Sequence, residues 1–244
     1  MVAPDMSIPG PIRTGQAAAP DAAVAVRVWD LPTRLFHWII AASIVGSVVT
    51  AKIGGNALAW HFRLGYLALA LLAFRLLWGF VGGYWSRFAT FVPGPGRLLR
   101  YLRGRTRPEE QAEVGHNPLG SLSVLAMLLL LALQVGTGLV ADDEIAHTGP
   151  LNRFVANATA LAATSWHKHW GSKLIVALVV LHVAAIVYYR VKKRRDLVPP
   201  MITGDKRLPR GVPASADGAA QRLFALVLAL ACAAAAAWVA SLGG

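Results

Sequence analysis

The chain has 244 residues, of which 56% are hydrophobic, and its formal net charge is +12 although only 15% of the residues are charged. An ordinary soluble domain is more polar, so this composition indicates a membrane protein whose basic residues are concentrated in a few segments. The single cysteine, Cys232, excludes a disulfide framework, a zinc ribbon and covalent haem attachment through a CxxCH motif.

The first 25 residues are rich in Ala, Pro and Gly and contain no apolar core segment. A secretory signal peptide requires such a segment, so residues 1–25 are expected to be a disordered tail and not a cleaved leader.

Four segments are apolar enough to cross a bilayer, which takes roughly 20 residues at about 1.5 Å each. A fifth segment is rich in Ala and is also expected to span, with an interfacial or buried helix as the alternative. The predicted fold class is therefore all-α, an integral membrane four-helix bundle with an additional C-terminal transmembrane helix. The bundle domain covers residues 26–207, and residues 208–220 form a linker. The expected helices are residues 33–53, 58–82, 118–141, 167–190 and 221–242.

Helix-breaking residues mark the ends of these segments. Asp30 and Pro32 precede the first helix, and Asn117-Pro118 is a cap followed by a first-turn proline. The long polar connection after the second helix contains a short amphipathic stretch at 96–103.

The basic residues predict the orientation, since Lys and Arg are enriched in cytoplasmic connections. They cluster at 87–107 and 190–210, whereas the connections on the other side carry few. The N-terminus is therefore expected in the cytoplasm. Topology explains the basic character, and no nucleic-acid partner is expected, because no basic stretch is interleaved with base-stacking aromatics.

Histidines lie at two depths in these helices. His37 and His182 are near the cytoplasmic side, whereas His61 and the pair His167 and His169 are near the outer side. Each level thus offers imidazoles from two helices, which is what a six-coordinate haem requires. His167 and His182 are separated by roughly 22 Å along the helix and about 60° around it, so two stacked haems fit. The alternative is that these are hydrogen-bonded packing residues.

Glycines support two of these assignments. His61 is followed by Gly65 and His167 by Gly171, and a glycine one turn beyond the ligand leaves room for a porphyrin against the helix. His169 lies about 140° around the axis from His182, so His167 is the predicted ligand.

Two arginines are expected to bind haem propionates, because the guanidinium group suits carboxylates. Arg75 lies 14 residues after His61 on nearly the same face, and Arg34 lies one turn before His37. The alternatives are snorkelling to headgroups for Arg75 and a cytoplasmic anchor for Arg34. His116 is either part of a helix-start turn or a proton-uptake group at a quinone site.

The stretches "VWDLPTRLFHW", "GHNPLG" and "HKHWGSKLIVALVVLH" resemble the bacterial cytochrome b561 family, which includes the cytochrome b subunits of nickel–iron hydrogenases. The resemblance covers about residues 26–207. It implies two non-covalent b-type haems with His37, His61, His167 and His182 as axial ligands, in a multi-pass protein of the bacterial inner membrane. The family commonly separates its last two ligands by 14 residues, whereas this chain offers 15 or 13, so the choice between His167 and His169 stays open.

The expected function is electron transfer between a redox partner protein and the quinone pool, with no catalytic residues of the chain's own. The partner would be a c-type cytochrome or a dehydrogenase or hydrogenase subunit, with membrane lipid around the helices. The alternatives are a haem-free membrane anchor and a metal-ion transporter. A transporter would need carboxylates or a Met/Cys set beside the histidines, and none is evident.

Overall fold

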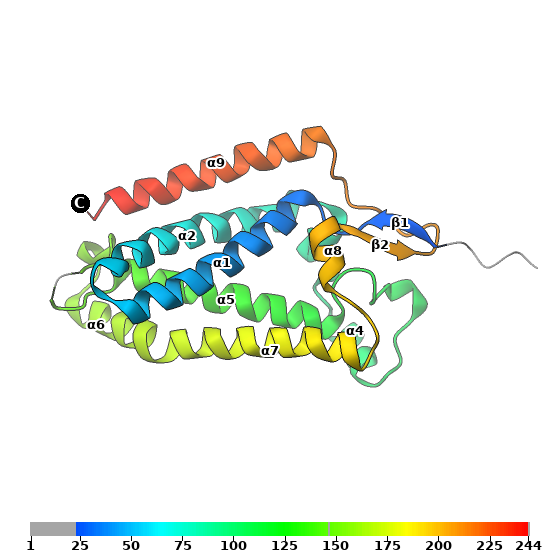
Figure 1. The fold of residues 1–244 in the computed structure, drawn as a ribbon, viewed down its shortest axis with the longest axis horizontal. Coiled ribbons are helices and arrows are strands. Elements are labelled where there is room, and N and C mark those ends of the chain that lie inside the picture. The colour runs from blue at the N-terminus through cyan, green and yellow to red at the C-terminus, as the bar shows by residue number, and fades with distance from the viewer. Residues whose placement is uncertain (1–22, 146, 244) are drawn as a thin grey trace, which may run out of the picture.

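The computed structural model describes residues 23–145 and 147–243, which form a bundle of membrane-length helices (Figure 1). The expected tail lies outside the described residues up to residue 22. Within the described ranges, five helical segments are long and apolar enough to cross a membrane, which confirms the all-α class. They are α1 (Leu31–Ile53), α2 (Leu58–Val81), α5 (Pro118–Val140), the continuous helix Asn157–Val191 and α9 (Ala219–Ser241).

Capping residues begin two of these helices as predicted. Asp30 precedes α1 and its carboxylate accepts from the Thr33 amide at 2.8 Å. Asn117 precedes α5 and its side chain accepts from the Gly120 amide at 2.7 Å. Both caps satisfy amides that have no partner within their own helix.

The fourth span begins at Asn157, and the predicted start at residue 167 was too late. It consists of α6 (Asn157–Ser165), a π-helical turn (Trp166–Gly171) and α7 (Ser172–Val191). The first part, α6, contains several polar residues, so its sequence is also typical of a connection between helices. In the structure the Thr164 hydroxyl accepts from the Asp142 amide and donates to the carbonyl of Ala160, so its polar group is satisfied within a helix.

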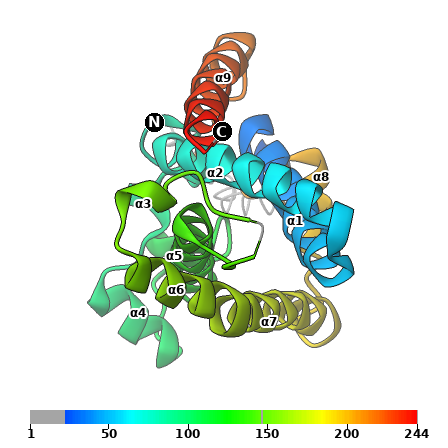
Figure 2. The same cartoon turned by 90° about the vertical axis from the view of Figure 1, so that its left-hand side faces the viewer.

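Figure 2 views the bundle from one end, with α1, α2, α5 and α7 around a common axis. α1 packs against α2, α2 against α5, and α5 against α7. α9 lies outside this group and packs on α2, where Ala225 and Cys232 meet Phe74 and Trp78. The four-helix bundle with an additional C-terminal helix is therefore confirmed.

A small cap closes the end of the bundle that carries the first described residues. Strands β1 and β2 pair antiparallel in it, with Val26 opposite Lys206. The chain between β2 and α9, part of the expected linker, is fastened to this cap, since the Ser215 amide donates to the Arg27 carbonyl at 2.7 Å. The elements are β1 (Val24–Arg27), α3 (Phe88–Phe91), α4 (Pro95–Leu102), α8 (Val198–Thr203) and β2 (Asp205–Leu208).

Candidate functional site

Two pairs of imidazoles face each other across the bundle. The inner pair, His37 of α1 and His182 of α7, lies at the end with the strands, and its ring centroids are 6.3 Å apart. The outer pair, His61 of α2 and His167 of the π-helical turn, lies towards the other end, with centroids 5.9 Å apart. The structure thus brings the four predicted histidines together in twos, whereas His169 is exposed.

The separations suit one metal ion between each pair of rings. A metal–nitrogen bond to imidazole is about 2 Å long, and a ring centroid lies about 1 Å beyond its nitrogen. Two such ligands on opposite sides of an iron would therefore place their centroids roughly 6 Å apart. Both pairs fit this distance. In each pair the two imidazoles come from different helices, so they could bind the opposite faces of a planar group that lies between those helices.

Hydrogen bonds fix the protonation of the outer pair. His61 Nδ1 lies 2.9 Å from the carbonyl oxygen of Ser47, and His167 Nδ1 lies 2.9 Å from that of Gln134. A carbonyl oxygen only accepts, so each Nδ1 carries the proton and donates it. Each Nε2 then has its lone pair available for a metal. In the inner pair, His37 Nδ1 is buried and has no hydrogen-bond partner among the described residues.

The π-helical turn changes the spacing along the fourth span. A π-helical turn contains more residues than an α-helical turn, and such turns are frequent at functional sites. It therefore takes up an additional residue within the 15 positions that separate His167 from His182. The ideal α-helix used for the sequence prediction did not include this turn, and no residue pattern marks it.

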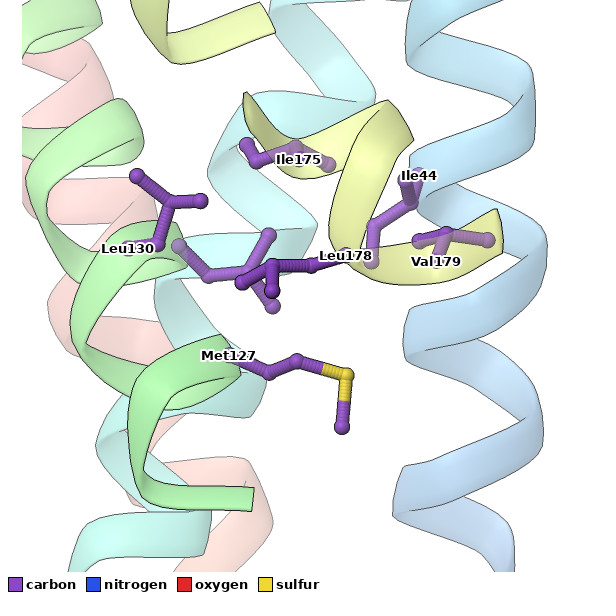
Figure 3. Close-up of a pocket in the computed structure, with 7 residues that line it drawn as sticks. Ile44, Met127, Leu130, Ile175, Leu178 and Val179 are labelled. Atoms are coloured by element: carbon purple, nitrogen blue, oxygen red, sulfur yellow. The ribbon is translucent and has the colours of Figure 1, made fainter. Parts of the chain in front are cut away.

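An apolar layer separates the two levels of histidine. It surrounds a cavity of about 20 Å³ between α1, α5 and α7 (Figure 3). Its lining has no ionisable side chain, so no chain of titratable groups connects the two levels there. The lining residues are Ile44, Met127, Leu130, Leu131, Ile175, Leu178 and Val179.

The two predicted glycines differ in their surroundings. A Cβ added at Gly65 would meet no atom within 4 Å, so a flat group has room there. A Cβ at Gly171 would lie 1.9 Å from Gln134 Oε1, which means that the amide of Gln134 occupies this space. The structure adds a third glycine that the sequence prediction missed. A Cβ at Gly138 would lie 2.9 Å from His167 Cε1, so Gly138 gives the imidazole its room.

The two predicted arginines also differ. Arg75 is 3% exposed, so it does not reach towards the headgroups, and its Nη2 donates to the Ser86 carbonyl at 3.1 Å. Its Nη1 is buried and has no partner among the described residues, so its N–H groups are available to an anion. Arg34 instead donates to the carbonyl of Ile202 and lies 3.9 Å from the Asp217 carboxylate.

His116 lies in the connection before α5, between two aromatic rings. Its ring centroid is 4.7 Å from that of Trp29 and 5.0 Å from that of Phe91. Burial, with a contribution from the Arg75 charge, lowers the pKa of His116 to about 3, so its imidazole is neutral at pH 7. Lys206 lies in the same region and donates to the Val114 carbonyl at 2.6 Å. Burial lowers the pKa of Lys206 to about 8.

A multi-residue metal centre is not found. In residues 23–145 and 147–243, no group of three or more His, Cys, Asp or Glu side chains is placed to hold a metal ion. A haem needs only the two nitrogens that each histidine pair offers.

Comparison with known proteins finds relatives of this chain. Several curated relatives carry the name "Probable Ni/Fe-hydrogenase B-type cytochrome subunit". The relative from Azotobacter vinelandii is 28% identical over 74% of this chain and 88% of its own length. That from Bradyrhizobium diazoefficiens is 25% identical over 75% and 86%, respectively. A relative from Escherichia coli K12, named as the subunit of hydrogenase 1, is 25% identical over 75% and 92%. No solved structure matches.

A family model described as prokaryotic cytochrome b561 matches residues 28–204, a range that contains both histidine pairs and ends before α9. The chain therefore belongs to the prokaryotic cytochrome b561 family, and it is a multi-pass membrane protein that carries haem b and transfers electrons.

Proposed function

We propose that this chain binds two haem b groups, one between His37 and His182 and the other between His61 and His167, and that it connects a redox partner with the quinone pool. The observation that carries the proposal is the presence of two facing imidazole pairs at different depths, with centroids 6.3 and 5.9 Å apart. When bound, haem supplies one-electron chemistry, and the chain supplies its ligands and its surroundings.

The chain's own groups have distinct roles in this proposal. The carbonyls of Ser47 and Gln134 hold the outer imidazoles in one tautomer with Nε2 unprotonated. Arg75 would hold a propionate at the inner level through its unpartnered Nη1 group, where a buried cation would offset the carboxylate. Gly65 leaves the surface of α2 open beside the outer level. The apolar layer keeps water and protons away from the path between the levels.

The inner end is the proposed quinone site. A quinone that is reduced takes up two electrons and two protons, and a hydrogen-bonding side chain beside aromatic rings would suit its carbonyl and its ring. His116, between Trp29 and Phe91, offers a neutral imidazole in such a position. The basic segments near this end, α4 among them, favour a cytoplasmic location for it in a bacterial inner membrane.

The opposite end is then available to the redox partner. The names of the relatives favour a nickel–iron hydrogenase in that role, and a c-type cytochrome is the second candidate. In the first case electrons enter at the outer pair and leave at the inner end. In the second case the direction is reversed.

Haem content of the purified protein tests the ligand assignment. His61→Ala and His167→Ala should each remove one haem, and His37→Ala and His182→Ala should each remove the other, as seen in reduced-minus-oxidised absorption spectra. His169→Ala is the matched control, because His169 is exposed and only two positions from His167, and it should retain both haems. Retention of both haems in any of the four variants, or loss of the same haem in all four, would contradict the assignment, and a colourless wild-type protein would favour the haem-free anchor.

A further inference from the structure

We infer that Gln134 is a positioning residue for His167 and that it lowers the reduction potential of the outer haem. The inference rests on the proposed function, because it requires His167 to be a haem ligand.

Gln134 and His167 make two reciprocal contacts between α5 and the π-helical turn. His167 Nδ1 donates to the backbone carbonyl of Gln134 at 2.9 Å. In return, the side-chain amide of Gln134 donates through Nε2 to the backbone carbonyl of His167 at 3.0 Å. One residue of α5 therefore holds both the ring and the backbone of the same histidine, which is more than ordinary helix–helix hydrogen bonding requires.

The backbone contact lies in the part of the fourth span where the regular hydrogen-bond ladder is interrupted. In a π-helical turn the carbonyls do not follow the α-helical pattern, and a donor from outside the helix stabilises the departure. The side chain of Gln134 enters this turn at Gly171, where a Cβ would lie 1.9 Å from Gln134 Oε1. The amide thus occupies a place that only glycine leaves open, and it fixes the turn that carries His167.

Gly138, one turn after Gln134 on α5, completes this arrangement. Any side chain at Gly138 would meet the ring of His167, since a Cβ there would lie 2.9 Å from Cε1. Gln134 and Gly138 therefore position the imidazole together from one face of α5.

The hydrogen bond from Nδ1 has an electronic consequence. An imidazole whose N–H donates to a carbonyl is a more basic ligand, and a more basic ligand stabilises the ferric form. Both outer imidazoles donate in this way, whereas His37 Nδ1 has no partner among the described residues. The outer haem should therefore have the lower reduction potential of the two.

Gln134→Met tests the role of the amide, because Met has a similar length and no hydrogen-bond donor. The turn should relax, and the bond from His167 Nδ1 should lengthen. We expect the equilibrium for reduction of the outer haem to shift about tenfold towards the reduced form, which is about 59 mV upward for a one-electron couple. The electron paramagnetic resonance signal of the outer haem should change with it, while the inner haem keeps its potential and signal.

Ser172→Ala is the matched control. The Ser172 hydroxyl also donates to a carbonyl of the π-helical turn, that of Lys168 at 2.8 Å, but no described hydrogen bond joins it to the imidazole of His167. This variant should leave both potentials unchanged. A redox titration followed by absorbance, together with the resonance spectra, gives all of these values without an activity assay.

The outcomes separate the inference from the proposed function. A wild-type protein with fewer than two haems would contradict the proposed function. Two haems with wild-type potentials in the Gln134→Met variant would overturn the inference alone, as would an equal shift in Ser172→Ala. If Gln134→Met does not fold, Gln134→Asn serves instead, because its amide is one methylene short. It should shift the outer potential in the same direction, and unchanged values would again overturn the inference.

Discussion

The carboxylate of Asp30 lies 2.7 Å from the hydroxyl of Ser86, a residue 56 positions away in the sequence, and both side chains are fully buried. The same carboxylate accepts from the amides of Thr33 and Gly83 and from the indole of Trp78. Asp30 thus joins the start of α1 to the end of α2 and the residues that follow it. Because the Ser86 carbonyl accepts from Arg75, Asp30 also fixes the segment that holds the buried guanidinium.

Replacement of Asp30 by Ala should therefore destabilise the protein and its inner site. Four buried donors would lose their acceptor, and each such loss is costly, so we expect a decrease of about 3 kcal/mol or more in the free energy of unfolding. Unfolding of the detergent-solubilised protein, followed by haem absorbance, measures the effect, and the inner haem should be lost first. Asp205→Ala is the control, since the ion pair of Asp205 with Arg27 is partly exposed and should contribute at most about 1 kcal/mol. Equal effects in the two variants would contradict this role for Asp30.

His116 should make the protein less stable in acid. Its pKa is about 3 in the folded protein and 6.5 when unperturbed, so the unfolded chain binds more protons between these values. Stability therefore rises with pH from about 3 to 6.5 and is lost as the pH falls through this range. Melting temperatures at pH 5 and pH 7.5 measure the loss. His116→Gln, which cannot titrate, should show a smaller difference between the two pH values, and an unchanged difference would show that other groups cause the pH dependence.

The helices and the histidine levels were predictable from the sequence, because both follow from local properties. A membrane-spanning segment is recognised from its own hydropathy, and the depth of a histidine follows from its distance to the ends of the helix. The pairing of His37 with His182 additionally needed only the alternation of helix directions. The pairing of His61 with His167 follows in the same way, from the number of residues between each histidine and the end of its helix.

The remainder depends on contacts between distant segments. Strands β1 and β2 have four residues each and pair Val24 with Leu208, a contact that no local pattern indicates. In the sequence Asp30 is an ordinary helix cap. Three of the four groups that donate to it, those of Trp78, Gly83 and Ser86, are brought to it only by the tertiary structure. The π-helical turn likewise makes a contact with a distant residue, since the side-chain amide of Gln134, 33 positions before His167, donates to the His167 carbonyl.

Gly138 should be essential for the outer pair. Gly138→Ala would place a Cβ 2.9 Å from His167 Cε1, closer than such atoms approach, so the ring must move. We expect the loss of most of the outer haem and retention of the inner haem, measured from absorption spectra of the purified variant. Gly136→Ala is the matched control on the same helix, because a Cβ there would meet nothing within 4 Å. Replacement of a helical glycine by alanine alone stabilises by about 0.5–1 kcal/mol, so this control should be at least as stable as the wild type. Outer haem occupancy that is equal in both variants would contradict the assignment of His167.

Removal of α9 should leave both haems in place. The match to the family ends at residue 204, and α9 packs on the side of α2 that carries Phe74 and Trp78. A chain that ends at Gly218 keeps Asp217, whose carboxylate binds Arg27 at 2.9 Å and the Leu31 amide at 3.0 Å. We therefore expect this truncation to bind two haems and to unfold at a lower temperature, because the contacts of Ala225 and Cys232 with α2 are lost.

A chain that ends at Val212 provides the comparison for this truncation. It also lacks Ser215 and Asp217, so Arg27 loses an ion-pair partner and the Trp85 indole loses its acceptor at the Pro213 carbonyl. Both of these contacts lie at the inner end, next to the cap formed by β1 and β2. This shorter chain should lose inner haem as well as stability, whereas the longer one should lose stability only. Haem loss that is equal in the two truncations would mean that α9 itself, and not the segment before it, supports the inner site.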